Sequence, residues 1–87
     1  MNVYVTKPYE KIQIQISGEL AVEISASGKL KVILKDVLND DYNYDGIAVV
    51  FINHSTYLLT NIPEFASLVL ENRDKTYFDV YVRRITR

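Results

Sequence analysis

The 87-residue chain contains no cysteine, only three glycines, two prolines and a single histidine. Without cysteine it can form no disulfide, no thiolate nucleophile and no cysteine-ligated zinc or iron–sulfur site. The glycines at positions 18, 28 and 46 are too far apart to build a phosphate-binding loop. These absences exclude several classes of enzyme and favour a reducing compartment, so we expect a cytoplasmic protein that needs no cofactor.

Long apolar runs are also missing, since no segment approaches the roughly 18 apolar residues of a membrane helix. The first residues lack the charged head and apolar core of a secretory signal. The net charge of −1 gives no global attraction to nucleic acid or to an anionic membrane. The length and the hydrophobic content of 48% predict one folded domain over residues 1–87, without a membrane role.

Catalytic groups are scarce as well. The one histidine, His54, stands beside Ser55, and adjacent residues of a strand point to opposite faces and pair poorly. A nucleophilic site would also need an orienting acid and an oxyanion hole. We therefore expect a turn histidine and a protein that is not an enzyme.

What the chain does contain is alternation of apolar and polar residues. The alternation covers residues 11–16, 20–24 and 29–35, which predicts three strands with one apolar face each. Gly18 and Gly28 lie in the short links between them. Short links favour antiparallel neighbours, so the pattern predicts an N-terminal three-stranded meander.

The second half of the chain predicts two further strands. Residues 47–52 are apolar without alternation, which is typical of a central strand that is covered on both faces. Residues 76–85 alternate and predict a C-terminal strand. A short strand is also expected at 2–6, and a short return strand at 56–59 after a turn at 53–55.

One segment, near 62–71, predicts a short helix. Asn61 and Glu64 have the spacing of a capping box, and Pro63 suits a first helical turn. Four apolar residues follow at i, i+3, i+4 and i+7: Ile62, Phe65, Ala66 and Val69. A strand over 66–71 is the competing interpretation. The predicted class is α+β, a small and mostly antiparallel sheet with one helix; an all-β small barrel is the alternative.

The most distinctive stretch is an acidic, tyrosine-bearing loop before the predicted central strand. Exposed tyrosines beside carboxylates are typical of contact surfaces, because tyrosine offers a large area at small entropic cost. We predict a protein-protein interaction module, an inhibitor or an adaptor, that binds a protein partner through this loop or through an exposed sheet edge. The predicted contact residues are Asp40, Asp41, Tyr42, Tyr44 and Asp45.

The same loop supports two alternatives. Asp41, Asn43 and Asp45 precede Gly46 with the spacing of half a calcium loop, but Ile52 stands where such a loop needs glutamate. Calcium binding is therefore a weak alternative. An acidic, tyrosine-bearing surface could also imitate nucleic-acid phosphates, as in a phage or viral accessory protein that inhibits a nucleic-acid enzyme.

A last alternative is nucleic-acid binding by a basic strand face. Basic residues interleaved with aromatics on a sheet neutralise phosphates and stack on bases. The candidate residues are Lys29, Lys31, Lys35, Tyr81, Arg83 and Arg84. A homodimer through edge strands at 3–5 and 80–82 is a further alternative.

Overall fold

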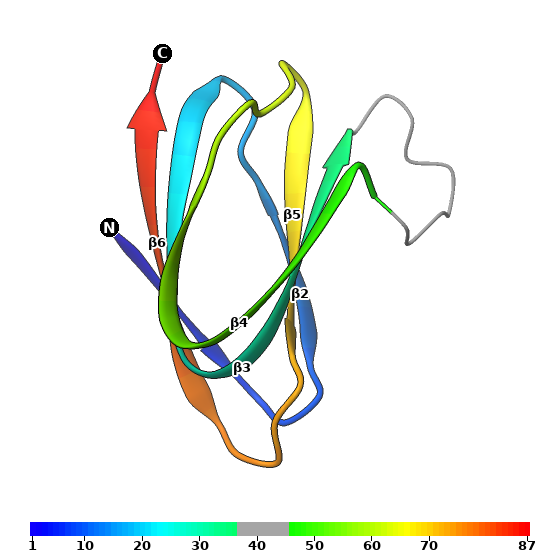
Figure 1. Cartoon of the computed structure of the whole chain (residues 1–87), viewed down its shortest axis with the longest axis vertical. Coiled ribbons are helices and arrows are strands. Elements are labelled where there is room, and N and C mark those ends of the chain that lie inside the picture. Colours follow the sequence, from blue (N-terminus) through cyan, green and yellow to red (C-terminus); the bar gives the residue numbers. More distant parts are fainter. Residues whose placement is uncertain (37–45) are drawn as a thin grey trace.

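The computed structural model describes residues 1–36 and 46–87, which form an all-β structure of antiparallel strands (Figure 1). Over these two ranges there is no helix, and so none long and apolar enough to cross a membrane. The strands are β1 (Asn2–Thr6), β2 (Lys11–Gln15), β3 (Glu19–Asp36), β4 (Ala48–Leu59), β5 (Ala66–Asn72) and β6 (Phe78–Thr86).

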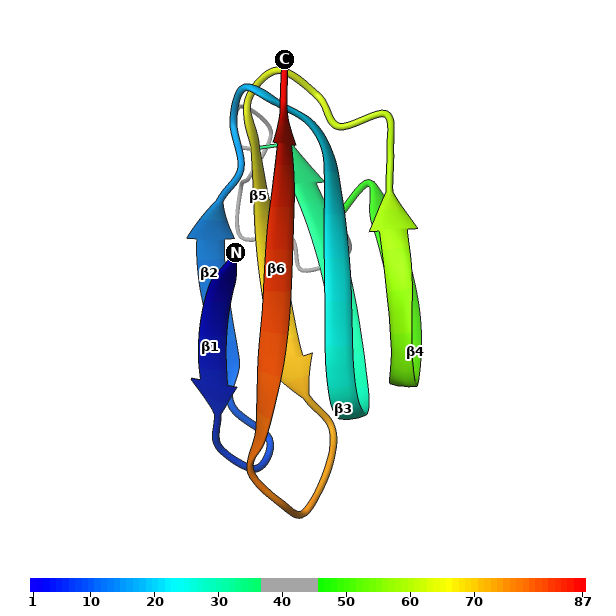
Figure 2. The same cartoon turned by 90° about the vertical axis from the view of Figure 1, so that its left-hand side faces the viewer.

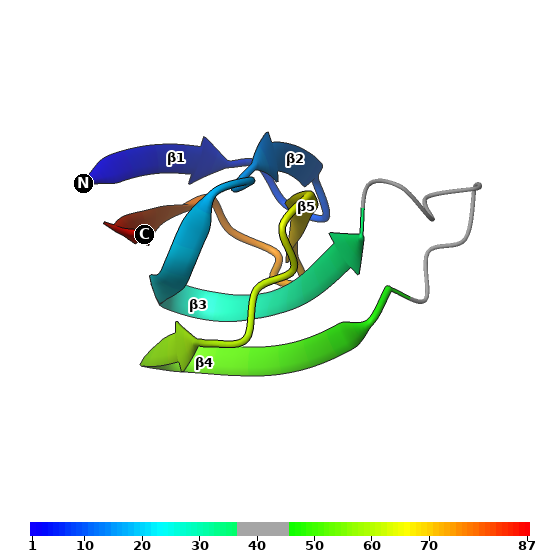
Figure 3. The ribbon, with the colours of Figure 1, turned by 90° about the horizontal axis from the view of Figure 1, so that it is seen from above.

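Strand β3 is the spine of the sheet. Along one edge its first half pairs with β6 and its second half with β5, while β4 follows the other edge over both halves. β1 then adds to β6 and β2 adds to β5, which gives the order β1-β6-β3-β5-β2. Seen from above, the sheet curls so that β1 and β2 lie opposite β3 across the interior (Figure 3).

The interior is filled by the alternate side chains of these strands. Burying one such Val, Leu, Ile or Phe side chain contributes about 1.5–3 kcal/mol, so a shared apolar interior holds the curled sheet together. Its most buried members come from β3, β5 and β6 together: Val22, Ile24, Leu30, Val32, Leu68, Leu70, Val80 and Val82.

A β-bulge bends the long strand between its two halves. Ala26 pairs with Ser55 and Lys29 with Asn53, so two residues of β3 oppose His54 alone. His54 has a φ of 48°, in the left-handed region. A bulge increases local twist, and because β3 keeps its even-numbered residues in the core on both sides of this bulge, the side-chain alternation shifts in β4. Even-numbered β4 residues therefore face the core before His54, and odd-numbered ones face it afterwards.

Gly28 lies in this bend because there is no room for a side chain. A Cβ atom at position 28 would lie 2.4 Å from Cδ1 of Phe78, whose ring is buried in the core. The absence of a side chain at Gly28 thus allows β3 to bend closely over the first residue of β6.

The predicted helix near 62–71 is wrong, and with it the α+β class; the all-β alternative fits. β5 occupies this segment, and all seven of its residues are buried. β2 and β3 pair with its two edges, and the burial of successive residues shows that both of its faces are covered, so its sequence does not alternate. Apolar residues on both faces happened to include a helical spacing, while Asn61 adopts a left-handed φ of 56° in the preceding loop.

The predicted N-terminal meander is also wrong. Residues 20–24 and 29–35 are two halves of one strand, since the stretch expected to turn at 25–28 is a bulge. The strand at 11–15 pairs with β5 instead of β3. The predicted strands at 2–6 and 76–85 correspond to β1 and β6.

The strand expected at 47–52 is not central. β4 runs on to Leu59 as one strand and pairs with β3 alone among the described strands, so it lies at the edge of the sheet (Figure 2). Its apolar run is half exposed: Val49 is 42% and Phe51 is 69% accessible to solvent. This exposure makes the edge of β4 a candidate binding surface.

We predict that Gly28→Ala lowers the free energy of unfolding by about 1–3 kcal/mol, because its Cβ overlaps the Phe78 ring in a packed core. Urea unfolding measures the loss. Phe78→Leu, made alone and in the Gly28→Ala chain, is the control. The smaller leucine should leave room for the alanine methyl group, so the two losses should sum to more than the loss in the double variant. If the two single losses of unfolding free energy simply add up in the double variant, position 28 and the Phe78 ring are not in contact.

Candidate functional site

The free edge of β4 is long and uncharged. Ala48–Leu59 contains no Asp, Glu, Lys or Arg in twelve residues and no proline. The other two strands with a free edge, β1 and β2, have five residues each. Proteins usually protect such edges with charges, proline or short length. Among the described strands, β4 is thus the longest edge without these protections.

Hydrogen bonds show which β4 residues turn their backbone to this edge. Arg73 donates its N–H to the Lys29 carbonyl at 2.8 Å, so Lys29 faces β5. Backbone groups alternate between the two sides of an antiparallel strand, so Leu30, Val32 and Leu34 face β4 and bond to it. The bond from Ile47 N–H to the Leu34 carbonyl, 2.8 Å, agrees with this phase.

Two residues of β4 therefore direct both main-chain groups outward. Ile52, Val50 and Ala48 are the register partners of the β3 residues that face β4. Val49 and Phe51, which lie between them, offer N–H and C=O at the free edge. Their side chains lie on the face of the sheet opposite the core, where each is exposed. This edge can add a strand through main-chain bonds and contact it with apolar side chains.

A pocket of about 420 Å³ opens beside Phe51, and the residues lining it are Lys29, Leu30, Phe51, Ile52, Asn53 and Arg73. Next to it, Lys31 places its Nζ atom 5.9 Å from the centre of the Phe51 ring, in cation–π contact. The pocket therefore lies between the exposed Phe51 ring and cationic side chains from β3 and from the end of β5, while the side chains of Leu30 and Ile52 point into the core on the other face of the sheet.

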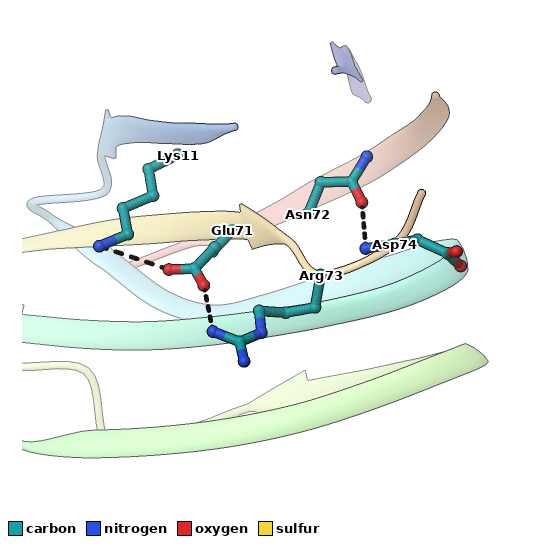
Figure 4. Close-up of polar contacts among 5 residues, drawn as sticks. All are labelled: Lys11, Glu71, Asn72, Arg73 and Asp74. Atoms are coloured by element: carbon teal, nitrogen blue, oxygen red, sulfur yellow. Dashed lines mark hydrogen bonds and ion pairs between the residues drawn. The ribbon is translucent and has the colours of Figure 1, made fainter. Parts of the chain in front are cut away.

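Glu71 is the carboxylate at the centre of this cationic group. Lys11 and Arg73 approach it from opposite sides (Figure 4). Arg73 donates from Nη1 to Oε1 at 2.7 Å, and Lys11 Nζ lies 3.5 Å from Oε2. The Glu71 residue is only 7% exposed. Burial raises its pKa, but the hydrogen bond from Arg73 and the charges of Lys11 and Arg73 outweigh burial, so the pKa lies below its usual value.

Asn72 fixes the turn from which Arg73 projects. Its side chain is fully buried and donates to the Thr6 and Thr76 carbonyls at 3.2 and 3.0 Å. Its Oδ1 accepts the Asp74 N–H at 2.7 Å, which Figure 4 shows at the start of the turn. These bonds join the ends of β1 and β5, so Arg73 leaves a rigid support.

The predicted basic face is not one surface. Lys29, Lys31 and Lys35 lie on the second half of β3, and Lys35 is 6% exposed. Tyr81, Arg83 and Arg84 lie on β6, which pairs with the first half. The register partner of Arg83, Glu23, is eight residues before Lys31, about 26 Å along an extended strand.

The β6 arginines also separate from each other. Arg83 forms an ion pair with Glu23 at 3.3 Å on the outer face. Arg84 points to the other face, where its Nη2 lies 3.5 Å from the Tyr4 hydroxyl. The structure thus groups Lys29 and Lys31 with residues that the sequence did not single out: Lys11, Phe51, Glu71 and Arg73.

The predicted contact residues Asp40, Asp41, Tyr42, Tyr44 and Asp45, and the weak calcium set Asp41, Asn43 and Asp45, lie outside the described residues. Among residues 1–36 and 46–87, no group of three or more His, Cys, Asp or Glu could hold a metal ion.

His54 lies in the bulge instead of a turn between two strands. Its Nδ1 is 2.6 Å from Oδ1 of Asn53, and the neighbouring hydroxyls of Ser25 and Thr56 bond to each other at 2.7 Å. These residues border a second, shallower hollow of about 310 Å³. The imidazole is oriented by an amide and not by a carboxylate.

No protein-family model and no curated protein sequence match this chain. One solved structure does: a de novo designed double-stranded β-helix, determined by solution NMR. The TM-score is 0.70 over 95% of each chain, with 16% sequence identity. This likeness shows the fold alone, a double-stranded β-helix in which two sheet halves enclose one core.

We predict that Glu71 makes stability depend on acid pH. Its lowered pKa means that the unfolded chain, with an ordinary value near 4.5, takes up the proton first. Stability from Glu71 is therefore full above that value and is lost as the pH falls through the lower folded pKa. Urea unfolding from about pH 6 to pH 3 should show a shrinking advantage of the natural chain over Glu71→Gln.

Glu64→Gln is the matched control, because Glu64 is exposed in the loop before β5. The difference between the natural chain and this control should change less over the same range. A Glu71→Gln difference that stays constant with pH would contradict the charge interaction with Lys11 and Arg73.

Proposed function

We propose that this chain is a non-enzymatic interaction module, located in the cytoplasm, that binds an extended segment of a partner protein along the free edge of β4. One observation carries the proposal: Val49 and Phe51 present exposed side chains, and main-chain groups that pair with no other described strand, on a long strand without charge. Strand addition is a general mode of peptide recognition in which main-chain bonds give affinity and side chains give selectivity.

The character of the exposed side chains supports this mode. On the outer face of β4, Phe51 is 69% and Leu58 is 50% exposed, and Val49 belongs to the same row. Side chains of an added strand on the same face would contact this row and bury part of it, and burying apolar surface contributes about 25 cal/mol per Å². Enclosed chemistry has less support, because the imidazole of His54 contacts an amide and both hollows are open beside the sheet.

Nucleic-acid binding has less support than a protein partner. The candidate basic residues divide between the second half of β3 and β6, which pairs with the first half, and Arg73, Lys11 and Arg83 already contact carboxylates. A nucleic-acid strand would need a continuous track of free cations along its backbone. The acidic loop at 40–45 stays a prediction as a second contact surface.

We predict that Val49→Pro abolishes or strongly weakens partner binding without unfolding the chain. Proline removes one outward N–H and places its ring in the path of an added strand, yet breaks no bond to β3. The probe is a display library of ten-residue peptides panned on the full-length chain, followed by fluorescence anisotropy. Losing one main-chain bond plus the clash should raise Kd about tenfold or more.

Val49→Thr is the matched control, because it keeps the N–H and the β-branched shape. It should retain most of the affinity, and both variants should retain the melting temperature within a few degrees. Amide NMR signals that move on addition of a selected peptide should belong to β4. A library that yields no binder, or signals that move on β1 or β2 instead, would overturn the proposal.

A further inference from the structure

We propose that the pocket beside Phe51 is a carboxylate subsite, which selects a partner strand that carries an acidic side chain opposite Phe51 or Asn53. This inference rests on the proposed strand addition at β4 and names the chemistry of the partner. Two lysines beside the pocket, Lys29 and Lys31, form no ion pair with any other residue of the described ranges.

Cations outnumber carboxylates among the described residues around the pocket. Lys29, Lys31, Arg73 and Lys11 lie on neighbouring strands or at their ends, and Glu71 and Asp74 are the nearby carboxylates. Glu71 is occupied by Lys11 and Arg73. Asp74 accepts the N–H groups of Lys29 and Lys75 at 3.5 and 2.8 Å. Among the described residues around the pocket, four cations thus stand against two engaged carboxylates.

Sheet geometry brings an incoming side chain to these cations. Side chains of directly opposed residues lie on the same face of an antiparallel pair, with Cβ atoms about 4.5–5.5 Å apart. A residue opposite Phe51 or Asn53 therefore lies on the outer face, beside the pocket that these two residues line. Lys31 pairs with Phe51, and Lys29 with Asn53, on the far side of β4.

The pocket offers both parts of an acidic side chain a suitable environment. The Phe51 ring, which is 69% exposed on the outer face, can contact the methylene groups. The rim of the pocket holds the Lys29 ammonium, the Arg73 guanidinium and the Asn53 amide, all donors to a carboxylate. Arg73 contacts Glu71 through Nη1, which leaves its other N–H groups for a second acceptor.

The same charges make a second copy of this chain the poorer occupant. A two-fold axis through the centre of β4 would lie between Asn53 and His54, at the middle of the twelve residues. Residues of the second copy's β4 would then stand opposite Phe51 and Asn53, and β4 contains no Asp or Glu. A second copy would thus bring no carboxylate to the pocket, whereas an acidic strand complements its cations.

The test uses three sets of ten-residue peptides of alternating threonine and valine, each with one variable residue moved through the central positions. The variable residue is glutamate, glutamine or lysine. We expect the best glutamate peptide to bind the full-length chain about three- to tenfold more tightly than its glutamine counterpart, and lysine to be weakest. The preference should shrink as salt is raised, because the site is partly exposed.

Lys29→Gln combined with Lys31→Gln should remove the preference, so that the glutamate and glutamine peptides bind this variant with equal affinity. The matched control is Lys7→Gln with Lys75→Gln, which makes the same change of net charge at two exposed positions outside the pocket. It should keep the preference.

The outcomes separate the two proposals. Equal affinity for the three peptides, lost in Val49→Pro, would overturn the carboxylate subsite and leave strand addition standing. No binding by any peptide would overturn both. Sedimentation that shows the free chain to be a dimer, with Val49→Pro monomeric, would replace the acidic partner by a second copy. Displacement of the glutamate peptide by short single-stranded DNA at equal affinity would overturn the choice of a protein strand.

Discussion

The constraint on which the rest of this structure depends is that β3 remains one strand through its bend. A turn at residues 25–28 would have separated two short strands and closed a local meander. The bulge opposite His54 instead keeps the backbone extended, and Gly28 leaves space for the ring of Phe78. Because β3 changes direction without ending, β6 and β5 can share one of its edges and diverge into the two halves that enclose the core.

The open edge of β4 follows from this arrangement. One edge of β3 is used twice, so its other edge has only β4 to pair with among the described strands. The adjacency of β4, β3, β5 and β2 also aligns one residue from each strand in register: Phe51, Lys31, Glu71 and Lys11. These residues lie far apart along the chain, from position 11 to position 71. The cationic pocket is thus a product of the sheet order and not of any local motif.

Local alternation predicted most of the strands but not their partners. Ile12 and Ile14, or Val80 and Val82, have the period of a strand whatever lies next to them. Ser25–Gly28 has the composition of a turn, and whether such residues turn or bulge depends on β4 and on Phe78, which only the folded chain provides. The prediction for the segment of β5 was wrong for a related reason. A strand that is covered on both faces shows no alternation, and the apolar residues from Ile62 to Val69 happen to have a helical spacing. The basic strand residues were found, but Glu71 and Arg73 could be joined to them only through the register of β3 with β5.

The placement of charge next to β4, instead of on it, has a physical consequence. Lysines on an edge strand itself hinder the addition of another strand and so act as protection. In this chain, Lys29 and Lys31 stand one strand inward, where Phe51 lies between them and the edge. From that position, one strand inward, the two lysines do not block the main-chain groups of Val49 and Phe51. Their charge still acts on the side chains of an added strand. An edge of this kind distinguishes between strands by charge, because specificity is a difference between affinities and the same cations attract one partner and repel another.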